Sequence, residues 1–292
     1  MKDRTWSFIF CFGIFFPLMC QAVIMPQHNS LAFRSSSILN TLSSKDVQSV
    51  YQDRDGYIWI STRNGLFQYD GYSITTYKSN LYCPDLLSSN NIFCVAEDSC
   101  HRLWIGTYSG LNVLDKRTGE VRKIENAELS GTGISQVLVT SDQRILFGTE
   151  IGLYEYKEID NSFLAYDTSN TGGGFPRATI KSLFEDDRGD IWIGIWNSGL
   201  YRYEKKTGKY WKYPKMNSGN SAHVVFQDSY KNIWVGTWGS GLHLLHNAYD
   251  PERTTWTTFT HNEKQPYTIS DNLIYAISED VNTHSLWVGT RS

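Results

Sequence analysis

One pattern recurs along the chain from Trp59 to the last residues, and this recurrence limits what the chain can fold into. Each copy is a short apolar run around a tryptophan, followed in five copies by Gly-Leu. The tryptophan positions are Trp59, Trp104, Leu146 (a replacement), Trp192, Trp234 and Trp287. They are separated by 45, 42, 46, 42 and 53 residues. Self-similarity at this period, with about four short strands in each unit, is typical of a β-propeller. The sequence therefore predicts an all-β fold built from four-stranded blades.

Each unit consists of short apolar runs joined by turn signals. In the first unit, Val47–Gln52, Tyr57–Thr62, Leu66–Tyr69 and Ser73–Tyr77 are separated by residues such as Asp70-Gly71, which favour tight hairpins. Units begin near residues 47, 92, 135, 180, 223 and 273, and the sixth holds only two runs. We therefore predict five full blades and half of a sixth. Because the last unit breaks off, we expect the chain to be an N-terminal fragment whose sixth unit is its least protected.

Three repeated features are explained by burial and turn chemistry. A blade is covered on both faces by its neighbours, so a run such as Ile58-Trp59-Ile60 should be apolar on both faces. Each tryptophan shares a face with a small residue two positions later, for example Gly106, which predicts indole rings stacked over backbone between blades. An aspartate recurs in the turn before the second strand, and we interpret it as a cap of that turn. These aspartates are Asp53, Asp98, Asp142, Asp186, Asp228 and Asp280.

The N-terminal residues 1–22 have the features of a secretory signal peptide. Basic residues precede an uncharged run, Trp6–Met19, and small residues follow up to Ala22. An uncleaved signal anchor and a lipoprotein signal ending at Cys20 are the alternatives. The sequence thus predicts export, with residues 23–292 as the mature chain. Within it, Leu31–Arg34 reads as an isolated strand that completes the last blade of a ring.

Composition and motifs exclude several kinds of function. A formal net charge of −3 with 20% charged residues gives no electrostatic basis for binding nucleic acid. The mature part has three cysteines, Cys83, Cys94 and Cys100, which form no disulfide framework; Cys94 lies in an apolar run and is interpreted as buried. The histidines are scattered, and we interpret them, His223 included, as satisfied structural residues. The sequence predicts no cofactor, no metal site and no catalytic residue.

The units resemble the two-component regulator propeller repeat, D-x-x-G-x-[IL]-W-[IV]-G-T-x-x-G-L-x-x-[YF]. The segments DRDGYIWISTRNGLFQY, DDRGDIWIGIWNSGLYRY and DSYKNIWVGTWGSGLHLL carry it, with departures at Ser61, Leu146 and Ile195. This resemblance implies a seven-bladed ring in the periplasmic sensor region of a hybrid two-component histidine kinase. Such a sensor responds to polysaccharide breakdown products and acts as a homodimer. The kinase activity would belong to a later part of the full-length protein, not to this chain.

We place the ligand site in the loops between second and third strands, which gather on one rim of a propeller. Aromatic residues are poor turn formers, so their presence in these loops indicates another role, and rings beside amide and guanidinium donors suit an oligosaccharide or another small-molecule signal. Packing of the rings against the next blade is the alternative. The candidate residues are Arg63, Asn64, Tyr108, Trp196, Asn197 and Trp238.

Two other classes of function remain open from the sequence. One is a secreted propeller glycosidase or lyase, supported by the segment Asp187–Trp192, which approaches an aspartate box. A glycosidase needs a pair of carboxylates across the sugar, and no pair stands out. The other is a scaffold with protein partners only, which an exposed apolar patch on a blade would favour.

Overall fold

The computed structural model describes residues 42, 46–80, 86–125, 129–169, 171, 175–214 and 221–291. All of them belong to one compact unit, Arg34–Ser292. The predicted signal peptide (1–22), the predicted strand Leu31–Arg34 and Cys83 lie outside the described residues. In the described part of the chain, no helix is long and apolar enough to cross a membrane.

The described strands form six antiparallel sheets, five of four strands and one of two, and we call them blades 1 to 6 in chain order. Blade 1 contains β1 (Val47–Gln52), β2 (Ile58–Thr62), β3 (Gly65–Tyr69) and β4 (Ile74–Tyr77). Blade 2 contains β5 (Ile92–Glu97), β6 (Arg102–Thr107), β7 (Gly110–Asp115) and β8 (Val121–Ile124). Blade 3 contains β9 (Ile134–Val139), β10 (Ile145–Thr149), β11 (Leu153–Lys157) and β12 (Ser162–Tyr166).

The later blades repeat this arrangement. Blade 4 contains β13 (Ile180–Glu185), β14 (Ile191–Ile195), β15 (Gly199–Glu204) and β16 (Lys209–Lys212). Blade 5 contains β17 (Ala222–Gln227), β18 (Ile233–Thr237), β19 (Leu242–His246) and β20 (Thr255–Phe259), and blade 6 contains β21 (Ile274–Glu279) and β22 (Leu286–Thr290). The predicted fold class, an incomplete propeller with five full blades and half of a sixth, is confirmed.

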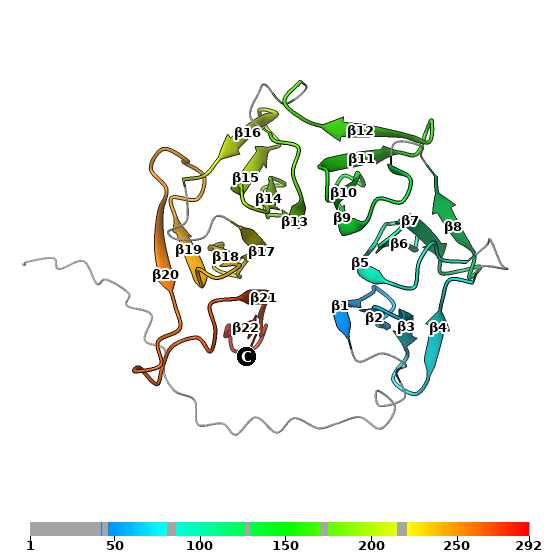
Figure 1. The fold of residues 1–292 in the computed structure, drawn as a ribbon, viewed down its shortest axis with the longest axis horizontal. Coiled ribbons are helices and arrows are strands. Elements are labelled where there is room, and N and C mark those ends of the chain that lie inside the picture. The colour runs from blue at the N-terminus through cyan, green and yellow to red at the C-terminus, as the bar shows by residue number, and fades with distance from the viewer. Residues whose placement is uncertain are drawn as a thin grey trace, which may run out of the picture. The chain divides into compact units, whose positions relative to one another are not determined.

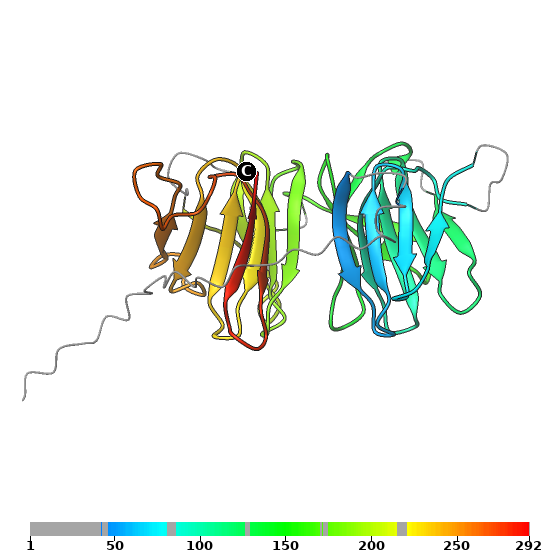
Figure 2. The same cartoon turned by 90° about the horizontal axis from the view of Figure 1, so that it is seen from below.

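The first strand of each blade is the innermost, and the first strands of successive blades lie side by side (Figure 1). Seen from the edge, the strands run between two rims (Figure 2). The mouth rim comprises the loops between second and third strands and the residues that enter each first strand. The base rim comprises the turns between first and second strands and between third and fourth strands. Hydrophobic clusters fill the spaces between neighbouring blades, so the core is divided among the blade interfaces.

The repeated aspartate and tryptophan form a pair at the base rim. In blade 1, Asp53 Oδ1 accepts the backbone N–H groups of Asp55 and Tyr57, while Oδ2 accepts the Trp59 indole N–H at 2.8 Å. Blades 2, 4 and 5 repeat the indole bond at 2.8–2.9 Å. The predicted turn cap is therefore confirmed there. The same carboxylate also holds the buried indole, a second role that the cap prediction did not include.

Blade 3 corrects the predicted register of these aspartates. The position six residues before Leu146 is Thr140, not Asp142, and Thr140 Oγ1 accepts the backbone N–H of Arg144. Asp142 instead accepts a bond from Thr140 Oγ1. The blade that lacks the tryptophan thus also lacks its acceptor. In blade 6, Asp280 caps its turn through the N–H groups of Asn282 and Thr283.

The small residue after each tryptophan serves a different purpose from the one predicted. A Cβ atom at Gly148 would lie 2.6 Å from Ile180 Cβ, and one at Gly194 would lie 2.6 Å from the Ala222 carbonyl oxygen. Both neighbours are the first residue of the next blade's first strand. The glycine therefore allows the next blade to approach, and the atoms nearest to these two positions belong to that blade and to Ser182, not to the indole expected there. Cys94 is buried and free, as predicted, and Cys100 is exposed and free.

Candidate functional site

Each first strand carries a β-bulge near its start, at the mouth rim. In β13, Ile180 pairs with Ile195 and Ser182 with Gly194, which leaves Lys181 without a partner on the second strand. The residues skipped in this way in the six blades are Gln48, Phe93, Ser135, Lys181, His223 and Tyr275. A bulge bends its strand and turns the side chain of the extra residue out of the regular alternation. Six equivalent side chains are thereby presented at one end of the innermost strands.

Five residues of blades 4, 5 and 6 meet at the mouth rim, and we call them the mouth cluster: Lys181, Trp196, His223, Trp238 and Tyr275. Trp196 and Trp238 are in contact edge to face, with ring centroids 5.5 Å apart. The Trp238 ring also meets His223 at 5.3 Å and Tyr275 at 5.6 Å. Trp238 is 41% exposed and Tyr275 46% exposed. The cluster is therefore an aromatic surface open to solvent, built from residues of three blades.

The backbone fixes both tryptophans. The Trp196 N–H donates to the Thr179 carbonyl at 2.9 Å, and the Trp238 N–H donates to the Ser221 carbonyl at 3.2 Å, so each ladder continues one residue beyond its strand. Asn197 follows with a φ of 56°, a left-handed conformation that asparagine tolerates better than most residues. Its N–H donates to Ser221 Oγ at 3.0 Å. The loop is thus a defined turn that presents Trp196.

The charge of the cluster resides on Lys181. Its Nζ lies 5.3 Å from the centroid of the Trp196 ring, within the range of a cation–π contact. Burial, and then the charge of Lys181, lower the pKa of His223 to about 4, so this histidine is neutral at pH 7. Its Nδ1 is buried and has no hydrogen-bond partner among the described residues. The interpretation of His223 as a satisfied structural histidine is therefore wrong.

The structure separates the predicted site residues into two groups. Trp196, Asn197 and Trp238 lie at or beside the mouth cluster. Arg63 and Asn64 lie in the hairpin loop of blade 1, where Arg63 is exposed and Asn64 half-buried, and Tyr108, 58% exposed, lies in that of blade 2. Lys181, His223 and Tyr275 were not among the predicted site residues. Each is the second residue of an observed first strand, β13, β17 or β21, and no sequence signal marked that position in advance.

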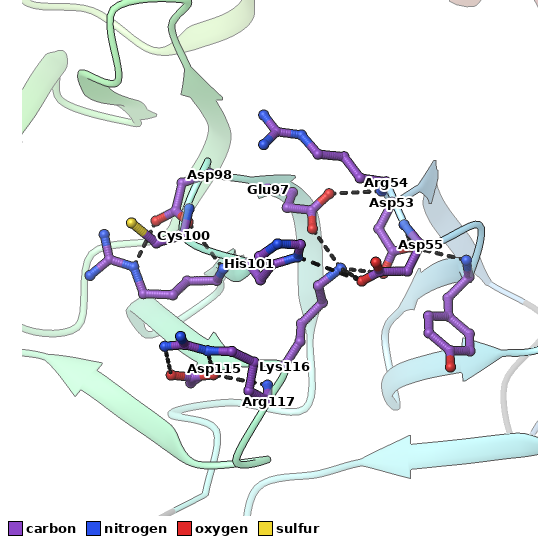
Figure 3. Close-up of polar contacts among 12 residues, drawn as sticks. Asp53, Arg54, Asp55, Glu97, Asp98, Cys100, His101, Asp115, Lys116 and Arg117 are labelled. Atoms are coloured by element: carbon purple, nitrogen blue, oxygen red, sulfur yellow. Dashed lines mark hydrogen bonds and ion pairs between the residues drawn. The ribbon is translucent and has the colours of Figure 1, made fainter.

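The base rim has a different character, which Figure 3 shows for blades 1 and 2. The Lys116 ammonium lies 2.8 Å from Asp53 Oδ2, 2.7 Å from Asp55 Oδ2 and 2.5 Å from Glu97 Oε1. Burial opposes the charge of Lys116, but hydrogen bonds to the three carboxylates outweigh it and raise the pKa of Lys116. His101 Nδ1 lies 3.8 Å from Asp55. Asp55, Glu97 and His101 could offer ligand atoms to a metal ion. Because Lys116 already supplies a cation between the two carboxylates, we assign this group a structural role.

A second contact at the base rim recurs from blade to blade, and we call it the clasp. The last residue of a first strand accepts a backbone N–H from the turn of the preceding blade. Arg54 donates to Glu97 at 2.8 Å, and Ser229 donates to Glu279 at 2.7 Å. Ser141 donates to Glu185 and Asp187 to Gln227 in the same way. The polar groups of the base rim are thus used to hold blades together.

Comparisons with known proteins agree with this fold. Four segments, residues 41–64, 86–109, 174–197 and 218–239, match the family described as two component regulator propeller. The histidine kinase P4 of Formosa agariphila is 33% identical over 54 residues, which cover 18% of this chain and 4% of that protein. The chain therefore corresponds to a small part of this relative.

Solved structures extend the comparison at the level of the fold. The extracellular domain of one hybrid two-component system from B. thetaiotaomicron is 20% identical, with a TM-score of 0.67, over 88% of this chain and 40% of that one. Another from the same organism is 24% identical, with a TM-score of 0.59, over 84% and 37%. Virginiamycin B lyase from Staphylococcus aureus is 13% identical, with a TM-score of 0.62, over 84% and 78%. The same fold thus occurs in regulators and in an enzyme.

Proposed function

This chain carries two-component regulator propeller repeats, and from that premise we propose that it is part of the exported, ligand-sensing region of a hybrid two-component regulator. In this proposal the propeller binds an oligosaccharide at the mouth rim. Binding is passed to a histidine kinase in another part of the full-length protein. The sensing region lies in the periplasm, and the full-length sensor acts as a homodimer. The chain spans 40% or less of the regulator domains described above, so the kinase and the dimer are inferred by family analogy.

The mouth cluster is the observation that supports binding. Two indoles and a phenol are held together at an exposed rim, although exposed aromatic rings in short loops contribute little to folding. Flat apolar ring faces stack against the apolar faces of sugars, while a few polar groups nearby fix the orientation of the ligand. The partial exposure of Trp238 and Tyr275 leaves ring surface available for such stacking.

The lyase fold relative makes an enzyme the second candidate, but the cluster does not favour it. Cleavage of a glycosidic bond ordinarily requires two carboxylates placed across the bond. The five residues of the mouth cluster include no carboxylate, and burial keeps His223 neutral. These groups are suited to holding a ligand, and we therefore propose sensing without turnover.

Calorimetry with a panel of plant and host oligosaccharides tests this proposal on the complete ectodomain. We expect the double variant Trp196→Ala/Trp238→Ala to lose at least tenfold in affinity, since each ring supplies stacking surface. Tyr230→Ala is the matched control, because Tyr230 is 69% exposed but lies in a base-rim turn. It should bind as the wild type does. Equal affinities of the wild type and the double variant would contradict the proposed site.

A further inference from the structure

The mouth cluster contains a lysine that has no counter-ion within the described part of the chain. Lys181 lies on β13, is half-buried, and forms no ion pair there, while its Nζ lies over Trp196. We infer that the ligand of this site is an acidic oligosaccharide, whose carboxylate or sulfate group is bound by the Lys181 ammonium while a neighbouring ring stacks on the tryptophans. This inference rests on the proposed function and adds the charge of the ligand.

The cost of burying charge supports this reading. A cation that is partly removed from water loses hydration, and proteins ordinarily compensate with a carboxylate or several acceptors. Lys116, the buried lysine of the base rim, has three carboxylates within 2.8 Å. Among the described residues, Lys181 has the face of the Trp196 indole and no carboxylate, and the indole compensates a small part of the loss. A site with a half-buried lysine that lacks a carboxylate partner is suited to bind an anionic ligand.

The bulge gives the lysine its direction. Because Lys181 has no partner on β14, its side chain leaves the regular alternation and reaches the Trp196 ring at the rim. His223 and Tyr275 occupy the same bulge position in the next two blades. His223 is neutral, so it adds no positive charge of its own but can donate or accept a hydrogen bond. The cluster therefore combines one cation, three rings and one neutral imidazole.

The positive charge of Lys181 acts on other residues of the mouth cluster. Its charge is one of the two causes that lower the pKa of His223, whose ring contacts Trp238 and Tyr275. In a partly desolvated site a charge acts more strongly than in bulk water. A carboxylate or sulfate beside Trp196 would thus gain a charge-assisted hydrogen bond, which is stronger than the bond a neutral hydroxyl could form.

The test compares Lys181→Met with a matched control, Lys212→Met, in the complete ectodomain. Lys212 belongs to β16 of the same blade and also lies over a ring, with Nζ 5.6 Å from the centroid of Tyr201, but on the outermost strand. Three probes of equal length are titrated by calorimetry: an oligogalacturonate, a sulfated oligosaccharide and a neutral xylo-oligosaccharide. The first two distinguish carboxylate from sulfate as the bound group.

We expect the wild type and Lys212→Met to bind one acidic probe at least tenfold more tightly than the neutral one. Lys181→Met should lose this preference, and raising the salt concentration should weaken only the lysine-dependent part of binding. Neutral binding at least as tight as acidic binding, or an acidic affinity unchanged in Lys181→Met, would overturn the inference. Failure of all three probes to bind, or binding that survives the double tryptophan substitution, would overturn the proposed function as well.

Discussion

Lys116 and Lys181 are two partly or fully buried lysines at opposite rims of the propeller, and their surroundings differ. At the base rim, Lys116 is 7% exposed and contacts carboxylates of blades 1 and 2. At the mouth rim, Lys181 contacts the Trp196 ring and, among the described residues, no carboxylate. The comparison indicates that Lys116 and its carboxylates hold blades 1 and 2 together, and it motivates the proposal that Lys181 binds a ligand.

At the base rim, buried polar contacts also link blades 4 and 5, through other residues. Arg202, 2% exposed, donates to Asp190 and to the Tyr249 carbonyl, and the Tyr249 hydroxyl donates to Asp186. Tyr249 lies in the turn between β19 and β20, so blade 5 reaches blade 4 through its turn, as Lys116 of blade 2 reaches blade 1. At the mouth rim, the rings of Trp196 and Trp238 link blades 4 and 5 instead.

The largest expected effect concerns Lys116. Lys116→Met leaves Asp53 and Glu97 buried beside each other without their cation, and we expect a loss of about 3 kcal/mol in unfolding free energy. Lys205→Met is the matched control, because Lys205 pairs with Asp142 across the same kind of interface but both side chains are about two-fifths exposed. It should cost about 0–1 kcal/mol. Urea unfolding followed by tryptophan fluorescence measures both losses. Equal losses would contradict the conclusion that the buried contacts of Lys116 stabilise the blade interface more than an exposed ion pair does.

Acid should weaken the two rims at different pH values. Burial and Lys181 lower the pKa of His223, and burial lowers that of His243, each to about 4. An unfolded histidine titrates near 6.5. The two neutral histidines therefore contribute fully to the unfolding free energy above about pH 6.5, and this contribution is lost as the pH falls toward 4. We expect a loss of roughly 1–2 kcal/mol for each over this range.

The base-rim carboxylates follow at lower pH. Burial acts to raise the pKa of Asp53, but hydrogen bonds from Lys116 and Trp59 outweigh it and hold that pKa below its ordinary value. Asp53 therefore contributes to the unfolding free energy above about pH 4, and this contribution is lost only below that pH. Thermal unfolding between pH 8 and 3 measures both steps. His223→Gln should reduce the first step and leave the second, and a stability that does not change between pH 7 and 5 would refute this order.

The smallest effect should come from the clasp. Glu185 accepts the backbone N–H and the hydroxyl of Ser141 from the preceding blade, and its removal should cost about 1 kcal/mol. Gln52 holds the same position in blade 1, and its described bond is to Gly56 of its own turn. Gln52→Ala should therefore change stability by less than about 0.5 kcal/mol. A loss for Gln52→Ala as large as that for Glu185→Ala would show that the clasp position matters for another reason.

The blade pattern was predictable because its causes are local. Gly, Asn and Asp at fixed offsets specify turns, and apolar runs between them specify strands, so β1 and β2 were placed within one residue of their observed bounds. The cap formed by Asp53 follows from the same local chemistry. The pairing of that aspartate with the Trp59 indole could have been found too, because blade 3 lacks both members of the pair.

The candidate site was only half predictable. Trp196 and Trp238 stood out because aromatic rings are unusual in hairpin loops, but nothing in the sequence places these two rings 5.5 Å apart. That distance depends on how closely blade 5 approaches blade 4, which the glycine at 194 permits. Lys181 and His223 were missed because a bulge leaves no sequence signal that distinguishes the extra residue from its neighbours.

The sequence by itself thus determined the number of blades, their strands and the turns that join them, since a period of two and the turn residues act over a few positions. Only the tertiary structure decided which side chains of different blades meet. Lys116 reaches Asp53 across 63 residues, and Lys181 reaches Trp196 because a bulge turns it toward the rim. Such contacts depend on the spacing and rotation between blades, which the packing of whole sheets fixes and no short segment encodes.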